Sequence, residues 1–463
     1  MYKTILVNKE NKFKENYLKK LELVNTKDIE NKDILIERET LENYLLLKDF
    51  LKEKNIEIGI DNSYRTIENQ KEIYNEYKEL YGSNYRDKIV AEPVFSEHHT
   101  GLAIDINIKV NGLFLKDNVE QEKNAKYYEE IFKYLKDFGF ILRYPKGKEK
   151  ITGYQYEPWH IRYVGKVPAT IIYENNWTLE EYLQEFSGVI VVNKPSGPTS
   201  FDIVNDISHI FGIKKVGHTG TLDPLAEGVL IVAIGKATKI VELLTKEDKE
   251  YVADVKLGIE TDTYDIEGKV LKNEPVQDNL DIEKALNYYK KTYLQEVPIY
   301  SAIKVNGKKL YEYAREKKEV ELPKKEVTIK EIELLEKSND EFTFKTCVSK
   351  GTYIRSLIRD IGNYLNTPAT MKRLIRTKQG NIDINDSNKI EDIKNNNYKL
   401  LSIEESLNYK VIELDDETAR KVSNGVKIDN IWNIKDKVIF KHNNKLLGIY
   451  EAKDDLLVTW KNF

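Results

Sequence analysis

Four side chains within the first 160 residues could together perform metal-assisted hydrolysis. The segment S-E-H-H-T-G-L-A-I-D contains His98 and Asp105, and the segment E-P-W-H contains Glu157 and His160. Zinc accepts two imidazoles and one carboxylate, and three protein ligands leave a fourth position for water, which is typical of catalytic zinc sites. Glu157 could take a proton from that water, whose pKa zinc lowers to about 7. The sequence therefore predicts that His98, Asp105 and His160 bind zinc and that Glu157 is a base.

A second chemical centre lies in the segment V-G-H-T-G-T-L-D-P-L-A-E-G-V-L, which spans residues 216–230. Its glycines and its proline force the chain through turns, and Asp223 stands among mostly uncharged neighbours. An Asp-Pro pair often only starts a turn, so a structural role is the alternative to a catalytic one. If Asp223 acts as a buried carboxylate, a nearby cation must keep it ionised.

The spacing of apolar residues predicts the elements that position the first group. Residues 36–54 and 122–138 carry apolar side chains with a helical period. Residues 103–108 alternate instead, so that Asp105 and Asn107 share one face of a strand and three isoleucines share the other. This pattern predicts an amphipathic strand that displays the carboxylate of Asp105.

The clearest domain boundary lies near residue 187. Residues 177–186 have a helical spacing of apolar side chains, whereas residues 188–200 are typical of a buried strand that ends in a Pro/Gly turn. The change of pattern indicates that one domain ends and another begins there.

The second half mixes strands with helices and then changes character. Strands are expected at residues 251–257 and 342–348, and a helix at residues 281–289. Short strands separated by turns follow from about residue 410. Both halves are therefore predicted to be α+β, with a small β-rich module at the end.

Seven blocks of the second half resemble, in order, the pattern of the TruB-type tRNA pseudouridine synthases. They are N-K-P-S-G-P-T-S (193–200), G-H-T-G-T-L-D-P-L-A (217–226), G-K-A-T-K (235–239), K-E-Y (249–251), T-D-T-Y-D (261–265), P-I-Y-S-A-I-K-V-N-G (298–307) and S-K-G-T-Y-I-R-S-L (349–357). The resemblance covers residues 188–380 and favours the catalytic interpretation of Asp223. It implies that this carboxylate acts near C1′ of a tRNA uridine, so that the base detaches, turns and rejoins through carbon, without a cofactor.

The same resemblance implies roles for four further side chains. Arg355 would pair with Asp223, and Tyr251 would stack on the uridine once it is flipped out of the RNA, which offsets an unstacking cost of a few kcal/mol. Tyr353 would line the same pocket, and His218 would hold the RNA loop. The implied substrate is the T arm of tRNA, with its uridine at position 55.

Two basic stretches are candidates for the surface that meets RNA phosphates. Residues 371–380 contain four basic and no acidic side chains, and residues 304–330 are also rich in lysine. A local basic surface is needed because the whole chain has a net charge of -4. The alternative is that these charge runs are only a solvated face.

The first half resembles the VanY-type D-alanyl-D-alanine carboxypeptidases over residues 1–186. Besides the two histidine segments, this resemblance rests on S-Y-R-T-I-E-N-Q (63–70), G-F-I-L-R-Y-P-K-G-K (139–148) and L-E-E-Y-L (179–183). It implies a D-Ala-D-Ala peptide as substrate. It also implies that Arg65 steadies the oxyanion and that Ser96 lies in the substrate pocket.

His99 is the main departure from that family pattern, which more often has Gln at this position. It places a second imidazole beside His98 and leaves two candidates for one zinc ligand. The seven-residue step from His98 to Asp105 matches the family pattern and favours His98 as the ligand.

Length and composition set limits on the chain as a whole. At 463 residues it should form two or three domains. The single cysteine, Cys347, excludes an intrachain disulfide and a zinc site with several thiolates, and it is expected to be a small buried residue. The first twenty residues resemble neither a signal peptide nor a membrane span, so we expect a cytoplasmic protein that does not contact membrane.

Together these patterns predict an α+β multidomain protein. A zinc D,D-peptidase-like domain would occupy residues 1–186, a pseudouridine synthase domain with a mixed α/β sheet residues 187–405, and a small PUA-like RNA-binding module residues 406–463. The expected function is a fusion enzyme that modifies tRNA and hydrolyses D-Ala-D-Ala peptides with Zn²⁺. The alternative is a synthase whose first half is a binding or folding module.

Overall fold

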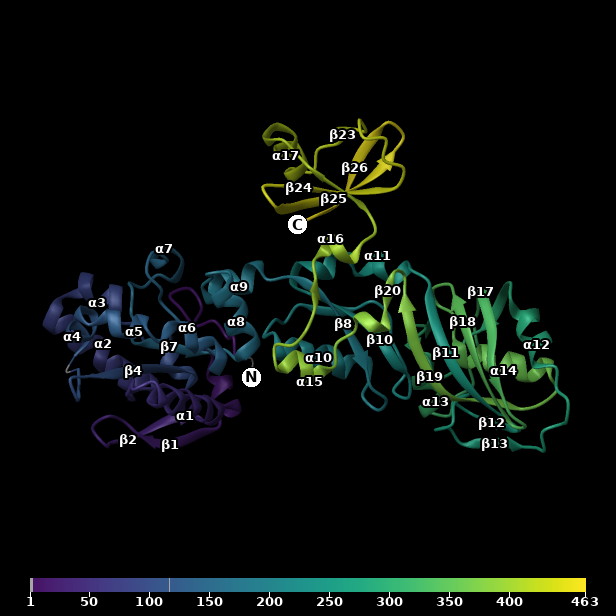
Figure 1. Ribbon diagram of the computed structural model, residues 1–463, viewed down its shortest axis with the longest axis horizontal. Coiled ribbons are helices and arrows are strands. Elements are labelled where there is room, and N and C mark those ends of the chain that lie inside the picture. Colours follow the sequence, from purple (N-terminus) through teal and green to yellow (C-terminus); the bar gives the residue numbers. More distant parts are fainter. Residues whose placement is uncertain (1–2, 116) are drawn as a thin grey trace. The chain divides into compact units, whose positions relative to one another are not determined.

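The computed structural model describes residues 3–115 and 117–463, and Figure 1 shows their helices and strands. Contacts divide the chain into two compact units. The first unit contains Met1–Phe186, Asp206–Lys215 and Ile390–Tyr398, and the second contains Ser187–Asn205, Val216–Lys389 and Lys399–Phe463. Each unit combines helices with sheet, so the predicted α+β class is confirmed.

An antiparallel sheet forms the centre of the first unit. Its strands follow the order β3 (Ile58–Asn62), β4 (Ala103–Val110), β7 (His160–Tyr163) and β6 (Phe140–Leu142), and β5 (Leu113–Phe114) pairs with β4. The strand predicted over residues 103–108 is confirmed as β4. Its isoleucines pack in one core with the apolar side chains of α1 (Arg38–Glu53), the helix predicted over residues 36–54.

The region predicted as helical over residues 122–138 is broken into short turns. It consists of α4 (Asn118–Lys123), α5 (Ala125–Glu129), α6 (Phe132–Leu135) and the 3-10 turn η3 (Lys136–Phe138). Asn124 separates the first two helices, because it leaves the helical conformation and its side-chain amide donates to Glu120 O. The predicted spacing still describes burial, since Tyr128, Ile131 and Leu135 all belong to the core.

The remaining elements of the first half surround this sheet. They are η1 (Glu15–Lys20), the hairpin β1 (Leu23–Lys27) and β2 (Asp33–Glu37), α2 (Ile67–Tyr81), α3 (Ser83–Ile89), η2 (Glu97–Thr100), α7 (Glu149–Thr152), α8 (Lys166–Glu174) and α9 (Leu179–Glu185). The last of these is the helix predicted over residues 177–186. It begins with a capping box, in which Thr178 and Glu181 satisfy each other's backbone N–H groups.

Two segments that follow residue 187 in the sequence complete the first unit. Phe211 stacks on Phe186 with ring centres 5.5 Å apart, and the hydroxyl of Tyr182 donates to Phe211 O at 2.6 Å. The ring of Tyr398 meets Phe211 edge-on at 5.4 Å. The first unit is therefore not one continuous stretch of sequence.

A mixed sheet of ten strands forms the second unit. Its order is β14 (Thr292–Glu296), β17 (Lys324–Lys337), β18 (Glu341–Val348), β11 (Lys249–Leu257), β19 (Ala369–Gln379), β10 (Glu227–Ile234), β8 (Gly188–Lys194) and β21 (Leu400–Leu401), while β9 (Val216–His218) pairs with β10 and β20 (Ile382–Asp383) with β19. The strands predicted in the ranges 188–200, 251–257 and 342–348 are confirmed as β8, β11 and β18. Only β10 and β19 pair in parallel along this path.

Helices and small hairpins complete the second half of the chain. They are α10 (Ser200–Ile210), η4 (Gly235–Ile240), α11 (Val241–Lys246), β12 (Ile259–Thr261) with β13 (Val270–Asn273), α12 (Ile282–Tyr289), β15 (Lys304–Val305) with β16 (Lys308–Lys309), α13 (Leu310–Arg315), α14 (Ile354–Tyr364), η5 (Ile384–Asp386), α15 (Ile390–Lys394) and α16 (Ile403–Ser406). The helix predicted at residues 281–289 is confirmed as α12.

Residues 410–463 form the short strands that the sequence predicts. The sheet order is β22 (Lys410–Glu413), β24 (Lys437–His442), β25 (Lys445–Lys453), β26 (Leu456–Asn462) and β23 (Ile428–Asp429). Helix α17 (Asp416–Ser423) contributes Val422 to a small core with Phe440, Tyr450 and Leu457. The chain therefore ends in a β-rich region.

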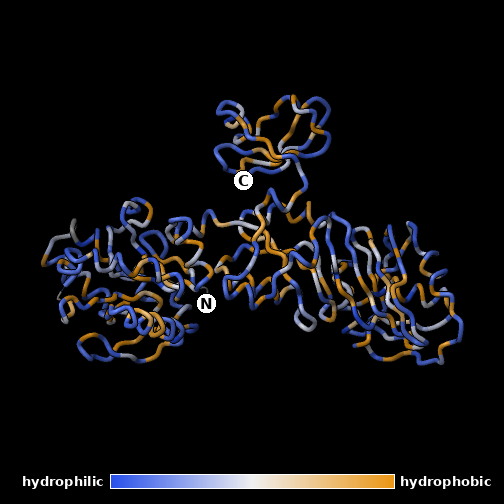
Figure 2. The backbone as a smooth tube through the Cα atoms, viewed as in Figure 1, coloured by the Kyte–Doolittle hydropathy of each residue, from blue (hydrophilic) through white to orange (hydrophobic). Residues whose placement is uncertain are grey.

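Two whole-chain expectations can be compared with the structure. Among the described residues, no helix is both long and apolar enough to cross a membrane, and Figure 2 shows only short apolar stretches along the tube. Cys347 is a free thiol, but it is half-buried on β18 and not fully buried as predicted. The alternation of β18 explains this, because the residues on either side of Cys347 are the ones that point into the core.

Two candidate active sites

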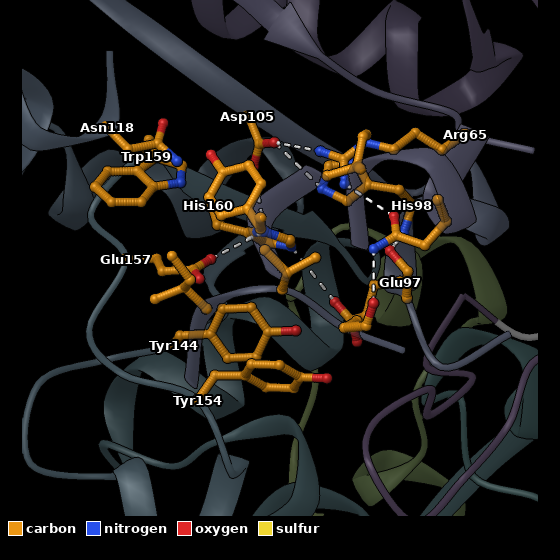
Figure 3. A pocket seen from close by; sticks show the side chains of 17 residues that line it. Arg65, Glu97, His98, Asp105, Asn118, Tyr144, Tyr154, Glu157, Trp159 and His160 are labelled. Carbon is orange, nitrogen blue, oxygen red and sulfur yellow. Dashed lines mark hydrogen bonds and ion pairs between the residues drawn. The ribbon is translucent and has the colours of Figure 1, made fainter. Parts of the chain in front are cut away.

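Strand register brings two of the predicted zinc ligands together. Asp105 on β4 lies directly opposite His160, the first residue of β7, in an antiparallel pair. Directly opposed residues of such a pair have Cβ atoms roughly 5 Å apart. His98 reaches the same place from η2, the short turn that precedes β4. Figure 3 shows the three side chains pointing toward one another. They line a cavity of about 90 Å³.

The donor atoms of these three residues fit a zinc ion. Together they offer one ligand atom each, and all three atoms lie within 4.8 Å of one another. His98 Nε2 is 3.3 Å from Asp105 Oδ2, and His160 Nδ1 is 3.2 Å from Asp105 Oδ1. Asp105 Oδ1 is buried and has no hydrogen-bond partner among the described residues, as expected for an atom that faces a metal. Two nitrogens and one oxygen are a donor set that zinc prefers.

The surroundings of His98 prepare it to bind metal. Its Nδ1 lies 2.6 Å from Ser63 O and can donate a hydrogen bond to that carbonyl, which leaves Nε2 as the free lone pair. Burial, helped by the positive charge of Arg65, lowers the pKa of His98 to about 4. The imidazole is therefore neutral near pH 7, which is the form that binds a metal.

The candidate base lies beside His160. Glu157 Oε2 is 3.4 Å from His160 Nδ1, and the carboxylate is almost completely buried in the wall of the cavity. Burial raises the pKa of Glu157, which makes it a better proton acceptor than an exposed carboxylate. The predicted base is thus adjacent to the ligands without belonging to the three-residue metal group.

Arg65, Ser96 and His99 surround the metal group in different ways. Arg65 and Ser96 both line the cavity, and Arg65 Nη2 lies 3.1 Å from Asp105 Oδ2. Ser96 caps η2 by accepting from the backbone of His98 at 3.3 Å. His99 is directed elsewhere, because its Nδ1 lies 2.8 Å from Arg65 O and its ring packs on Phe13. The choice of His98 over His99 as the candidate ligand therefore agrees with the geometry.

A buried network of charges that was not predicted from the sequence lies behind the site. Glu97 Oε1 accepts from Arg143 Nε at 2.8 Å and lies 2.7 Å from Arg162 Nη1, and Arg143 also binds both carboxylate oxygens of Glu180 at 3.0 and 2.7 Å. Burial alone would raise the pKa of Glu97, but the two guanidinium groups hold it well below its usual range. Glu97 Oε2 lies 3.8 Å from His160 Nε2, beyond hydrogen-bond distance.

The sequence did contain a signal for this network. Arg143 and Arg162 both stand within short apolar strand patterns, F-I-L-R and H-I-R-Y, where a solvent-exposed arginine is not expected. Both side chains are completely buried. A charged residue at a position predicted to be buried requires a partner of opposite charge, and this rule could have linked them to Glu97.

The second candidate site is the loop around Asp223, which two buried side chains hold through hydrogen bonds to its backbone. Lys194, at the end of β8, is completely buried, and its Nζ donates to the carbonyls of Pro195, Pro224 and Ala226 at 2.9, 3.0 and 2.7 Å. The Ser200 hydroxyl donates to Leu222 O and accepts from Leu222 N. These bonds fix the residues on both sides of Asp223, and no role was predicted for either anchor from the sequence.

Arg355 provides the cation next to Asp223. Its Nε lies 2.9 Å from Asp223 Oδ2, and its Nη1 lies 3.5 Å from Asp265 Oδ2. The guanidinium also donates to Thr263 O and Tyr300 O, which holds it in one orientation. Asp223 was expected to be buried, but its side chain is 35% exposed. The carboxylate is therefore accessible from solvent and is not enclosed in the core.

The other three predicted side chains lie at different positions around this pair. Tyr353 precedes α14, and its pKa is raised by burial and, in part, by the negative charge of Asp223. Tyr251 is buried on β11, where it pairs with Arg376 of β19. His218 ends β9, and its Nδ1 accepts from Gly220 N at 3.2 Å. Of the four side chains that the resemblance groups with Asp223, the described interactions link Arg355 and Tyr353 to it.

The basic stretch predicted over residues 371–380 is not a free cationic surface. Lys372, Arg373 and Lys378 form ion pairs with Glu341, Glu227 and Asp383. Arg376 is buried, and it donates to Val229 O at 2.6 Å and to Gly220 O at 3.2 Å. The alternation of β19 turns this arginine inward, so it supports the Asp223 loop and does not face phosphate.

Two family models match separate parts of the chain. Residues 208–354 match the TruB family pseudouridylate synthase (N terminal domain), and residues 33–166 match D-alanyl-D-alanine carboxypeptidase. The tRNA pseudouridine synthase B of Clostridium tetani (strain Massachusetts / E88) is 46% identical over 270 residues, which cover 57% of this chain and 92% of that protein. The chain belongs to the tRNA pseudouridine synthase B family.

Other relatives extend this comparison. The tRNA pseudouridine synthase B of Caldanaerobacter subterraneus subsp. tengcongensis is 42% identical over 273 residues, which cover 58% of this chain and 96% of that protein. The stretch of this chain that matches the synthase family includes Asp223 and Tyr251, and it ends one residue before Arg355. The carboxypeptidase model contains all three candidate zinc ligands. A solved vancomycin-resistance D,D-pentapeptidase, VanY, in complex with Zn(II), is 32% identical, with 40% of this chain and 99% of that chain covered and a TM-score of 0.34.

Proposed function

We propose that this member of the tRNA pseudouridine synthase B family converts uridine 55 in the T loop of tRNA to pseudouridine, with Asp223 as the catalytic carboxylate. The ion pair between Asp223 and Arg355 is the observation that supports this assignment most. It places a guanidinium against a carboxylate that is still open to solvent. Because tRNA is the substrate, we place the reaction in the cytoplasm.

In the proposed reaction the bond between C1′ and N1 breaks, the base turns, and a bond between C1′ and C5 forms. C5 loses a proton and N1 gains one, so the product is an isomer of the substrate. Asp223 acts at the C1′ region, Arg355 orients its carboxylate, and Tyr353 lines the pocket. Tyr251 and His218 are proposed to bind the flipped base and the RNA loop. The anchors Lys194 and Ser200 hold the loop in place, so little reorganisation is needed during the reaction.

Release of the C5 proton gives a direct test of the synthase. The full chain would be incubated with a tRNA transcript carrying tritium at C5 of its uridines, and released tritium would be counted. A transcript with cytidine at position 55 is the matched control. We expect one equivalent of tritium from the uridine transcript and none from the control. Equal release from both would mean that another uridine is modified.

We also propose that the first half is a zinc-dependent carboxypeptidase or dipeptidase for D-Ala-D-Ala substrates. The convergence of His98, Asp105 and His160 supports it. When bound, Zn²⁺ would act as a Lewis acid and lower the pKa of water. Glu157 would accept the proton of the attacking water at Oε2, and its raised pKa favours that role. Arg65 would face the oxyanion, and Ser96 would contact the peptide.

Peptide hydrolysis distinguishes this proposal from a synthase with a non-catalytic first half. The full chain would be loaded with zinc and incubated with D-Ala-D-Ala and with a peptide that ends in D-Ala-D-Ala, and free D-Ala would be measured. We expect release that stops on addition of a chelator and returns with zinc. Zinc binding without any release of D-Ala would favour the alternative, in which this half only binds or assists folding.

A further inference from the structure

A basic cavity of about 690 Å³ lies in the first unit, outside the zinc site. Its walls come from the segment Thr4–Lys20, from Leu183 of α9, and from residues 212–215. The charged side chains around it are five lysines and one glutamate, namely Lys12, Lys14, Lys20, Lys214, Lys215 and Glu10. Neither the zinc chemistry nor the residues around Asp223 use this cavity.

The cavity is built by close packing and is not a chance gap between loops. The hydroxyl of Thr4 donates to Gly212 O at 2.6 Å. Gly212 has a φ of +64°, and a Cβ at this position would lie 2.3 Å from Thr4 Cγ2, so only glycine permits the contact. The hydroxyl of Tyr182 fixes the neighbouring carbonyl of Phe211. These contacts join the amino-terminal segment to residues 212–215.

Four of the five lysines around this cavity are available to a ligand. Lys12, Lys14, Lys20 and Lys215 are exposed, and in the described part of the chain none of them is ion-paired with a carboxylate. The basic stretch on β19 differs, because its cations already have acidic partners or are buried. A surface that concentrates uncompensated positive charge attracts a polyanion even when the net charge of the chain is -4.

The sequence connects this cavity to the synthase site. Lys215 immediately precedes β9 (Val216–His218), and Asp223 follows eight residues later. Eight residues span at most roughly 30 Å even when fully extended. A tRNA that presents its uridine to Asp223 therefore has phosphates within reach of the cavity, and lysines bind phosphates as mobile point charges.

We propose that this cavity binds the phosphate backbone of the tRNA substrate, so that the peptidase-like unit supplies part of the tRNA-binding surface. The inference rests on the proposed synthase function. It assigns RNA binding to Lys12, Lys14 and Lys20. These lysines lie before both histidine-containing segments of the peptidase-like half. The chain then has a surface for tRNA that its synthase half does not provide alone.

The test compares two triple variants of the full chain. The cavity variant replaces Lys12, Lys14 and Lys20 with Gln. The control variant replaces Lys48, Lys52 and Lys71 with Gln. These three lysines are exposed, lie on α1 and α2 of the same unit and lack ion pairs among the described residues. Both lose the same net charge. Kd for an unmodified tRNA transcript would be measured between 50 and 250 mM salt, where each lost phosphate contact lowers the slope of log K against log salt by about 0.7 to 0.9.

We expect the cavity variant to lose about 2 units of slope and to bind tRNA at least tenfold more weakly at low salt, whereas the control changes its slope by less than about 0.5. The KM of the cavity variant for tRNA should also rise by a larger factor than its kcat falls. Equal slopes for the two variants would overturn the proposal, whether both are weakened or neither. Tritium release by the unsubstituted chain is measured in parallel, so failure of the synthase assignment itself would be seen separately.

Discussion

The two candidate sites are held in place by different physical means. In the candidate zinc site, strand register sets Asp105 opposite His160, and behind them lies a fully buried network of Glu97 with two arginines. In the synthase site, Asp223 lies on a loop that Lys194 and Ser200 hold through backbone groups, and its side chain is one third exposed. The first arrangement suits a small peptide and an ion that are enclosed, and the second suits a large RNA that must approach from solvent.

The difference shows where each site can be damaged. A buried charge network fails when one member is removed, because its partner is left as an unpaired charge in a nonpolar interior. A loop held by several hydrogen bonds loses one bond at a time, at about 1 kcal/mol each. The following substitutions are arranged from the largest expected effect to the smallest, and each tests one side of this contrast.

Asp223→Asn should abolish the synthase while leaving its substrate bound. We expect tritium release to fall by at least about 10⁴-fold, because the carboxylate acts in the chemical step. The Kd for tRNA should stay within about tenfold of the parent, since phosphate contacts provide most of the affinity. Full turnover by this variant would remove Asp223 from the mechanism.

Substitutions of a candidate zinc ligand and of the candidate base should have different effects on zinc content. His160→Ala is expected to lose both zinc and hydrolysis, whereas Glu157→Ala should retain zinc and lose about 10²- to 10⁴-fold in hydrolysis. Zinc content by atomic absorption and release of D-Ala from the same samples provide the two readings. If His160→Ala still holds one zinc per chain, the ligand set is wrong.

Arg143→Met tests the buried network. It leaves Glu97 with one guanidinium and Glu180 with none, so the free energy of unfolding of the first unit should fall by about 3 to 5 kcal/mol. Zinc affinity is also expected to fall about 10- to 100-fold, because the support behind His160 is disturbed. Urea titration with zinc competition would measure both. The control is Lys27→Met, which breaks an exposed cross-strand pair with Asp33 in the same unit and should cost at most about 1 kcal/mol.

An equal effect of these two variants would show that the network contributes no more than a surface ion pair.

Ser200→Ala should have the smallest effect of the series. It removes both hydrogen bonds to Leu222, at an expected cost of about 1 to 2 kcal/mol and less than about tenfold in kcat for tritium release. Hydrolysis of D-Ala-D-Ala should be unchanged. Ser196→Ala, at an exposed position of the same turn, is the matched control and should be neutral within about 0.5 kcal/mol. A loss of more than 10³-fold in kcat would instead give Ser200 a direct part in the chemistry.

Much of this arrangement could be predicted because it depends on local patterns. The alternation of residues 103–108 predicted β4, and the helical spacing of residues 36–54 predicted α1. Ligand types and spacing led to His98, Asp105 and His160, which the structure brings within 4.8 Å of one another. These features require only that a side chain's neighbours along the chain determine which way it points.

The rest depends on partners that are distant in sequence. The register of Asp105 against His160 joins residues from separate strands, and no local pattern fixes it. The packing of Phe211 on Phe186 likewise joins the first unit to a segment within the synthase-like sequence. The charge of residues 371–380 predicts that Arg376 faces phosphate, but the alternation of β19 turns this side chain inward. The domain boundary proposed at residue 187 remains a prediction, because the first unit also contains residues 206–215 and 390–398, which are distant in sequence.

The pairing of β4 with β7 also has a consequence for how this gene can change. Substitutions along β4 leave the opposition of Asp105 and His160 intact, but inserting or deleting one codon before Asp105 within the strand would turn every later side chain to the opposite face of the sheet. The carboxylate would then leave the cavity while the strand itself persisted. Among descendants of this sequence, length changes should therefore be confined to the loops that flank β4, and a single-codon deletion inside it should eliminate metal binding more reliably than most replacements.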